Sequence, residues 1–438
     1  MRKLEDYLHQ NAQLYPDKLA AICNDETITY SELEKRVVER AATLPKGEII
    51  TFRASQSIDF LVTYYAIHEA GSVAVPLEKD TPQELFDEIS ARLRANKVVE
   101  GTADILYTTG TTGKSKGVMI SHRTILADAE NLIEGQLFSH ELLFIINGPL
   151  NHIGSLSKLF PVMMLGATVY ILEGMRDVNL FFKALDYPAR KVATFFVPAS
   201  ARILIQFSNE QLASYADKID FIECGGAPLA HADMLTLCRL LPKTRLYNTY
   251  ASTETGIIST YNYNDGRCIA GCLGKPMSHS RIIITPEGKI SCQGDTLMSG
   301  YIGEPELTAT VLRGDTVYMS DLGRIDEEGM LHIGGRQDDI INVGGYKVAP
   351  TEVEDVAMSL PEVKDCICIS AEHKIMGNAL KLLVVTAEGA TFDKRRIALY
   401  LKSKLEAYKV PMLYEQVDAV KRTYNGKVDR KYYKMPTV

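Results

Sequence analysis

The stretch Tyr107–Gly117 has the composition of a loop that binds phosphate groups. Its three glycines let backbone amides converge on anionic oxygens, while four threonines add hydroxyl donors and two lysines add positive charge. It lies between the apolar pair Ile105-Leu106 and the β-prone run Val118-Met119-Ile120, so we expect it to join two strands. The candidate phosphate-binding residues are Thr108, Thr109, Gly110, Thr111, Thr112, Gly113 and Lys116.

A Walker A loop is the obvious alternative, because Gly113-Lys114-Ser115 ends like one. That pattern requires glycine where Thr108 stands, and it opens a long helix rather than a strand. A flexible linker is also disfavoured, since linkers are rarely set between β-prone runs. The sequence therefore predicts a phosphate loop of another kind.

The elements around this loop alternate between helices and short apolar strands, an order typical of parallel α/β layers. We predict strands at 72–77, 168–172, 194–198 and 221–224, and helices at 33–44 and 229–241. From about 266 to 335 short strands punctuated by glycine indicate a small β-rich, barrel-like subdomain. Pro350 introduces a predicted helix at 351–359, and another follows near 393–405.

These elements predict a multidomain α/β protein with a boundary near Asp338. Residues 1–337 form the large N-terminal domain, with two α/β sheet layers and the β-rich subdomain. Residues 338–438 form a small, mobile α+β C-terminal domain. A chain of 438 residues exceeds the roughly 250–300 at which a single core stops growing, so more than one unit is expected.

Composition excludes several classes of protein. The apolar share of 46% and charged share of 24% are ordinary for globular proteins, and a net charge of −7 disfavours nucleic acid as the main partner. There is neither an export signal nor an apolar run long enough to span a membrane, so we expect a cytoplasmic protein. Eight cysteines without CxxC spacing are expected to be reduced thiols.

The phosphate loop and several further motifs resemble those of the ANL superfamily of adenylate-forming enzymes. This superfamily includes acyl-CoA and aryl-CoA synthetases, adenylation domains and luciferase. The further motifs follow in the family's order as Cys224–Pro228, Asn248–Glu254, Tyr318–Asp321, Gly335–Asp338, Asn342–Lys347 and Thr423–Arg430. The chain departs from the family pattern where Ser115 replaces proline and where Ala251 and Ser320 replace glycine. The resemblance covers nearly the whole chain and implies ATP, Mg²⁺ and a thiol acceptor as cofactors and co-substrates.

The resemblance also implies roles for individual residues. Tyr250 would pack on adenine, Thr253 would reach the α-phosphate and Glu254 would bind magnesium, as suits a hard cation. Lys427 would be the catalytic lysine that bridges the substrate carboxylate and the α-phosphate. The remaining nucleotide and thiol contacts would come from Gly225, Gly226, Ala227, Pro228, Asn248, Asp321, Arg336, Gly344 and Gly345, with Asp338 as the hinge.

The acid substrate is less defined. His152 falls where acyl-CoA synthetases carry a histidine at the mouth of the acyl pocket, and neither Asn151 nor His152 supplies the carboxylate that would hold an amino-acid ammonium group. An acyl, aryl or succinylated aromatic acid is therefore favoured. Only about thirty residues separate Pro76 from Thr108, which indicates a shortened N-terminal subdomain and leaves the depth of the pocket open.

Three functions remain open at this point. The first is a ligase that joins a small carboxylic acid to coenzyme A, and the second is a stand-alone ligase that charges the phosphopantetheine of an acyl or peptidyl carrier protein. The third is a nucleotide-binding protein without catalysis, against which the presence of Glu254, Asp321 and Lys427 argues. Oxygenase chemistry of the luciferase kind has no distinguishing feature here.

Overall fold

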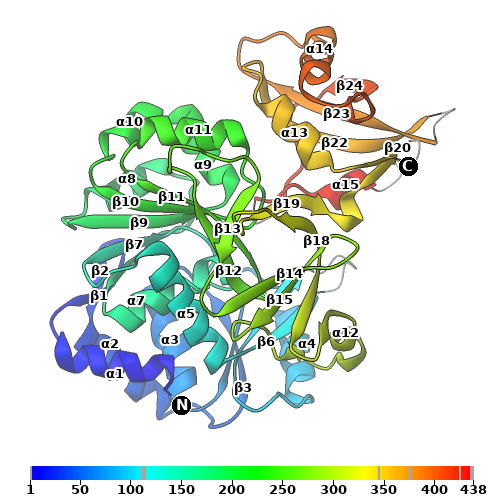
Figure 1. Ribbon diagram of the computed structural model, residues 1–438. Coiled ribbons are helices and arrows are strands. Elements are labelled where there is room, and N and C mark those ends of the chain that lie inside the picture. The colour runs from blue at the N-terminus through cyan, green and yellow to red at the C-terminus, as the bar shows by residue number, and fades with distance from the viewer. Residues whose placement is uncertain (1, 110–114, 344–345, 374–376, 424–425, 435–438) are drawn as a thin grey trace.

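A computed structural model describes residues 2–109, 115–343, 346–373, 377–423 and 426–434. Figure 1 shows a large N-terminal part built on two sheets and a smaller C-terminal part next to the end where β18 and β19 lie. Among the described residues, no helix is both long and apolar enough to cross a lipid bilayer. All eight cysteines lie in the described part of the chain, and none of them forms a disulfide there.

The smaller N-terminal sheet carries the phosphate loop. Its strands run in the order β16-β6-β5-β4-β3, where β3, β4 and β5 are parallel and β5 and β6 form an antiparallel pair. The predicted loop therefore joins two strands, as the sequence indicated. The strands are β3 (Ile49–Ala54), β4 (Val73–Glu78), β5 (Thr102–Thr109), β6 (Ser115–Ser121) and β16 (Gly300–Tyr301). The helices of this region are α1 (Leu4–Leu14), α2 (Tyr30–Ala41), α3 (Ile58–Glu69), α4 (Gln83–Arg94) and α5 (His122–Gln136).

The larger sheet contains a parallel run, β1-β8-β7-β9-β10-β11, that continues through antiparallel pairs into β12 and β13. Its strands are β1 (Leu19–Cys23), β2 (Glu26–Thr29), β7 (Leu142–Ile146), β8 (Thr168–Ile171), β9 (Lys191–Phe196), β10 (Ile219–Cys224), β11 (Arg245–Ser252) and β12 (Gly256–Asn262). The associated helices are α6 (Ile153–Leu156), α7 (Leu159–Leu165), α8 (Val178–Asp186), α9 (Pro198–Phe207), α10 (Asn209–Ser214) and α11 (His231–Leu240).

The β-rich region is antiparallel, as predicted, and its strand pairing is continuous with the larger sheet in the order β14-β15-β18-β19-β13. The elements are β13 (Cys272–Pro276), β14 (Ser280–Ile284), β15 (Lys289–Gly294), α12 (Pro305–Val311), β17 (Leu312–Arg313), β18 (Thr316–Ile325) and β19 (Leu331–Arg336). The short strand β16 leaves this region and pairs with β6 of the smaller sheet. This pairing brings Tyr301 to the hairpin that carries the phosphate loop.

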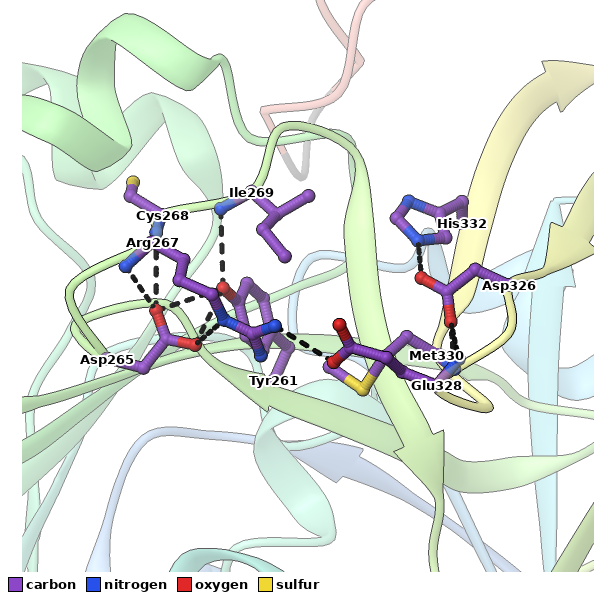
Figure 2. Close-up of polar contacts among 9 residues, drawn as sticks. All are labelled: Tyr261, Asp265, Arg267, Cys268, Ile269, Asp326, Glu328, Met330 and His332. Atoms are coloured by element: carbon purple, nitrogen blue, oxygen red, sulfur yellow. Dashed lines mark hydrogen bonds and ion pairs between the residues drawn. The ribbon is translucent and has the colours of Figure 1, made fainter.

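Two turns beside β18 and β19 are fixed by carboxylates (Figure 2). In the loop after β12, Asp265 accepts hydrogen bonds from the backbone amides of Arg267 and Cys268, at 2.8 and 3.2 Å. Asp326 accepts from the amides of Glu328 and Met330 in the β18–β19 turn, at 3.0 and 2.9 Å. An Arg267–Glu328 ion pair of 2.9 Å joins the two turns. This bracing fixes the hairpin of β18 and β19, which carries Asp321 and Arg336, two of the predicted nucleotide contacts.

The C-terminal part has its own apolar core, centred on residues such as Val353, Leu382 and Leu401. Its elements are η1 (Gln337–Asp339), β20 (Ile341–Val343), β21 (Tyr346–Val348), α13 (Pro350–Met358), β22 (Val363–His373), β23 (Gly377–Thr386), α14 (Lys394–Lys404), η2 (Ala407–Lys409), β24 (Leu413–Gln416) and α15 (Arg430–Lys434). The order of strands in its sheet is β22-β23-β24. A separate core is what a body that moves as a unit requires.

Element positions follow the sequence prediction within a few residues, with one instructive difference. The helix expected at 33–44 is α2 and begins three residues earlier, at Tyr30. The cause is a capping box, in which Thr29 Oγ1 accepts from the amide of Glu32 and the Glu32 carboxylate accepts from the amide of Thr29. These bonds pair amide groups that the first turn of a helix leaves free.

Candidate active site

Glu254 lies in the turn between β11 and β12, beside a tyrosine that sequence reasoning missed. The hydroxyl of Tyr301 donates to Glu254 Oε1 at 2.9 Å, and the ammonium group of Lys116 lies 5.2 Å from the centre of the Tyr301 ring. Burial and the Glu254 carboxylate raise the pKa of Tyr301 well above its ordinary value, so the phenol keeps its proton. A phosphate-loop lysine and a carboxylate suited to a hard cation thus meet across one aromatic ring.

A second group forms where β18 and β19 pair. Asp321 and Arg336 are Cα partners in this ladder, and Arg336 Nε donates to Asp321 Oδ1 at 3.1 Å. The Tyr250 hydroxyl, from the end of β11, donates to Asp321 Oδ2 at 2.6 Å. Burial and the carboxylate of Asp321 raise the pKa of Tyr250, which keeps this tyrosine neutral. The structure therefore brings together three residues that are far apart in the sequence and that were each assigned to the nucleotide.

Lys427 comes from the C-terminal part and reaches the same region. Its Cε atom lies 3.7 Å from where a Cβ atom on Gly226 would stand, beside the exposed loop after β10. Its side chain is solvent-accessible, yet the surrounding protein and Arg336 lower the pKa of Lys427, while Asp321 and Glu254 act in the opposite direction. The lysine therefore lies within electrostatic range of both carboxylates and of Arg336.

The turn that carries Lys427 is closed by its own hydrogen bonds and tied to the N-terminal part. The amide of Thr423 donates to the carbonyl of Lys427 at 2.7 Å. Arg422 donates to the carbonyl of Gly426 at 3.2 Å and to the carboxylate of Asp365 at 2.6 Å. Asp365, on β22, also pairs at 3.4 Å with Arg202 of α9. A chain of ion pairs thus links the lysine turn to the N-terminal part.

His152 lies just before α6, and Glu78 at the end of β4 is its partner. The distance from His152 Nε2 to Glu78 Oε1 is 2.9 Å. Hydrogen bonding from His152 lowers the pKa of Glu78, and Asn151 adds to this effect. Glu78 is a carboxylate near the expected pocket mouth that sequence reasoning did not find, because it is 74 residues away from His152.

A buried ion pair lies close to the loop after β10. Lys158 and Glu223 are almost fully buried, and the ammonium nitrogen lies 2.8 Å from the carboxylate. The ring of Phe195 lies 5.1 Å from the same ammonium group and packs where Gly154 and Gly225 leave room for it. Because leaving one of the two charges unpaired would be costly, the pair acts as a unit in this wall of the site.

Other predicted residues are placed less directly. The side-chain amide of Asn248 is buried and donates to the carbonyl of Cys272 at 3.0 Å, so this donor is used within the protein. Thr253 is half-buried and precedes Glu254. Ala227 and Pro228 follow Gly226 in the loop after β10. Thr108 pairs with Lys116 across the β5–β6 hairpin. Gly110, Thr111, Thr112, Gly113, Gly344 and Gly345 lie outside the described residues, as do the side chains of Thr109 and Asp338.

This combination of a two-sheet α/β body, a phosphate-loop hairpin and a lysine delivered by a separate C-terminal unit defines an adenylate-forming enzyme. The chain matches the model of the AMP-binding enzyme family over residues 8–104 and 90–302, and that of the AMP-binding enzyme C-terminal domain over 352–427. It belongs to the AMP-binding enzyme family, within the ANL superfamily, and is an AMP-forming acid–thiol ligase.

Similar proteins come from several bacteria. A feruloyl-CoA synthase of an Amycolatopsis species is 27% identical, with 96% of each chain covered. A 2-succinylbenzoate–CoA ligase of Bacillus cereus is 25% identical, with 94% of each covered. The crystal structure of ATP-bound MatB from Rhodopseudomonas palustris is 23% identical and superposes with a TM-score of 0.85 over 97% of this chain and 98% of that one. The last comparison confirms the fold.

Proposed function

We propose that this enzyme uses ATP and Mg²⁺ to convert an acyl or aryl carboxylic acid to its adenylate and then transfers the acyl group to coenzyme A. The observation that carries the proposal is the position of Lys427, which lies in the electrostatic neighbourhood of Glu254, Asp321 and Arg336. Because these groups come from both parts of the chain, their convergence supports an arrangement made for adenylation.

In the adenylation step, the carboxylate of the acid attacks the α-phosphorus of ATP, an acyl–phosphate bond forms and pyrophosphate leaves. Lys427 would offset the negative charge that accumulates where the two anionic groups meet. Asp321 and Arg336 would hold the ribose, and Tyr250 would pack on adenine. The phosphate loop and Lys116 would bind the leaving phosphates, because amides, hydroxyls and an ammonium group suit anionic oxygens.

Magnesium fits the donor set at Glu254. Mg²⁺ prefers hard oxygen ligands and is usually held by one or two carboxylates together with substrate phosphates. The Tyr301 hydroxyl orients one oxygen of Glu254 at 2.9 Å. Bound there, the ion would neutralise charge on the departing pyrophosphate.

For the thiol step we propose that residues 338–438 rotate as a unit about Asp338, bringing Gly344 and Gly345 to the site in place of Lys427. The separate apolar core of the C-terminal part supports this division at 337/338. Short polar residues at a boundary suit a hinge, since closure concentrates backbone change in a few positions. ATP and coenzyme A are abundant in the cytoplasm, which is where we expect the enzyme to act.

The substrate is proposed to be an acid without a free α-ammonium group. Glu78, the carboxylate that lies beside His152, is engaged by His152 and Asn151 and so is not free to hold an ammonium group. The relatives named for feruloyl-CoA and 2-succinylbenzoate support an aromatic or succinylated aromatic acid as the first class to test.

The first experiment measures pyrophosphate release with ATP and Mg²⁺ for aryl, short-chain, long-chain and amino acids, each with and without coenzyme A. Turnover that depends on coenzyme A with an aryl or acyl acid is the expected result. A stoichiometric burst that coenzyme A does not change would replace the acceptor with a carrier protein. Turnover with free amino acids alone would contradict the proposed substrate class.

A matched pair of lysine variants tests the site. Lys427→Ala is expected to reduce adenylate formation by at least about a thousandfold, because it removes a charge that acts on the reacting groups. Lys402→Ala changes an exposed lysine of the same C-terminal part and should leave both half-reactions unchanged. Equal activity of the two variants would refute the assignment of Lys427.

A further inference from the structure

Three buried ligand-type side chains converge at the end of the β5–β6 hairpin opposite the phosphate loop. Glu5 lies in the first turn of α1, His68 in the last turn of α3 and His122 at the start of α5. One carboxylate oxygen and one ring nitrogen from each histidine lie within 4.8 Å of one another. The three residues are 5%, 1% and 7% exposed, so water does not solvate them freely.

Each of the three residues has one polar atom that the protein leaves without a partner. Within the described part of the chain, Glu5 Oε2, His68 Nδ1 and His122 Nδ1 are buried and have no hydrogen-bond partner. Lys3 lies 3.6 Å from the other oxygen of Glu5. Buried polar atoms in native proteins are nearly always paired, so three such atoms in one cluster call for a common partner.

The neighbouring groups are those that usually support a metal-bound histidine. His68 Nε2 lies 2.8 Å from Asp104 Oδ1, and the Tyr64 hydroxyl donates to Asp104 Oδ2 at 2.8 Å. A carboxylate on one ring nitrogen fixes the tautomer and orientation that present the other nitrogen to a metal ion. Asp104 therefore occupies His68 Nε2 and leaves Nδ1 as the ring nitrogen available to an ion.

We propose that Glu5, His68 and His122 bind one divalent transition-metal ion of the zinc type. Two imidazoles and one carboxylate form a ligand set that zinc accepts at about 2.0–2.2 Å, usually with tetrahedral geometry. Ligand atoms no more than 4.8 Å apart need to move inward by only roughly 0.7 Å each to reach such distances. A water molecule would complete the coordination.

The ion would have a structural role. It would connect α1 and α3 to the start of α5, directly after β6. Asp104 and the phosphate loop are at opposite ends of β5, about 15–20 Å apart at the rise of a strand. The ion would therefore anchor the N-terminal helix and the base of the hairpin, without contact with the reacting groups.

A metal-free alternative has a different signature. Burial alone would lower the pKa of His68, but Asp104 and Glu5 outweigh it and raise this pKa, with a smaller contribution from the carbonyl of Ala103. In that case His68 would be a buried imidazolium between two carboxylates. Such a network would hold no metal and would not respond to chelators.

The test uses the full-length enzyme and measures its metal content after gel filtration, then again after treatment with a chelator and reloading with Zn²⁺ or Co²⁺. We expect close to one equivalent of metal per chain, a melting temperature that falls by several degrees on stripping and recovers with Zn²⁺, and the visible absorption of tetrahedral Co²⁺.

Variants locate the site. Glu5→Gln and His122→Gln should each retain less than about a tenth of the metal, and stripping should no longer change their melting temperature. The control is His9→Gln on the same helix, because both ring nitrogens of His9 already pair with Glu34 and Glu69, at 2.8 and 2.9 Å. It should keep its metal. If the wild-type chain binds neither Zn²⁺ nor Co²⁺ and neither ion changes its melting temperature, the proposal is wrong and the metal-free network holds. This outcome does not depend on whether the variants fold.

Discussion

The ion pairs of Asp365 predict that a change at this residue slows adenylation but not thioester formation. Asp365 on β22 accepts from Arg422 at 2.6 Å and pairs with Arg202 at 3.4 Å, and Arg422 in turn holds the carbonyl of Gly426 beside Lys427. The Arg202–Asp365 pair joins the two parts, so it requires the C-terminal part to lie where it delivers the lysine. The Arg422–Asp365 bond lies within the C-terminal part and holds the lysine turn on β22. Asp365→Asn should therefore disfavour the adenylation arrangement without touching the nucleotide.

The magnitude follows from the bonds that are lost. Charge-assisted hydrogen bonds contribute about 1.5–3 kcal/mol each, and asparagine retains one acceptor, so a net loss of about 1–2 kcal/mol is expected. That corresponds to adenylation roughly 5- to 30-fold slower. The side chains of Arg202, Asp365 and Arg422 are 16–28% exposed, so salt screens their interactions in part. At high salt we therefore expect the smaller reductions in adenylation rate within this range.

The assay compares ATP–pyrophosphate exchange with thioester formation from supplied acyl-adenylate. Exchange should fall by this factor, while thioester formation stays within about twofold of the wild type, since in the proposed mechanism that step uses the rotated arrangement. Glu415→Gln is the control, because it breaks a Lys381–Glu415 pair of 2.5 Å inside the C-terminal sheet. Equal losses in both half-reactions, or the same effect from the control, would refute the reasoning.

Three further predictions concern the N-terminal part. Tyr301→Phe removes the hydroxyl that orients Glu254, so adenylation should slow about tenfold and require more Mg²⁺; an unchanged Mg²⁺ dependence would contradict this. Burial raises the pKa of Asp128 from 3.8 to about 8, so the folded protein holds a proton that the unfolded chain has lost, and stability should fall as pH rises from about 4 to 8. Asp128→Asn should flatten that decline in melting temperature; parallel pH profiles would show that Asp128 is not its cause. Gly256→Ala places a Cβ atom 2.3 Å from Asp128 Oδ1 at a φ of +66°, so the free energy of unfolding should fall by at least about 2 kcal/mol. Gly288→Ala has a similar φ of +79° but nothing within 4 Å of the Cβ atom, so it should lose only about 1 kcal/mol. Similar losses for the two variants in chemical denaturation would count against the clash.

The sequence by itself determined the features that local patterns encode. The strand–loop–strand setting of the phosphate loop follows from glycines and threonines between β-prone runs, and Pro350 marks the start of α13 as predicted. Family motifs selected Glu254, Asp321 and Lys427, because each lies in a short recognisable segment. The helix boundary at Tyr30 was missed by three residues, since the capping box at Thr29 decides it rather than apolar spacing.

Only the tertiary structure decided which side chains meet. Tyr301 reaches Glu254 across 47 positions and Arg202 reaches Asp365 across 163, and no local pattern records such pairs. Asn248 lies in a predicted nucleotide motif, yet packing directs its amide to the carbonyl of Cys272. Hydrophobic periodicity specifies the elements and their buried faces, whereas these contacts depend on how finished sheets and helices stack. The cluster of Glu5 and its two histidines exists for the same reason, because three separate helices place their ends at one point.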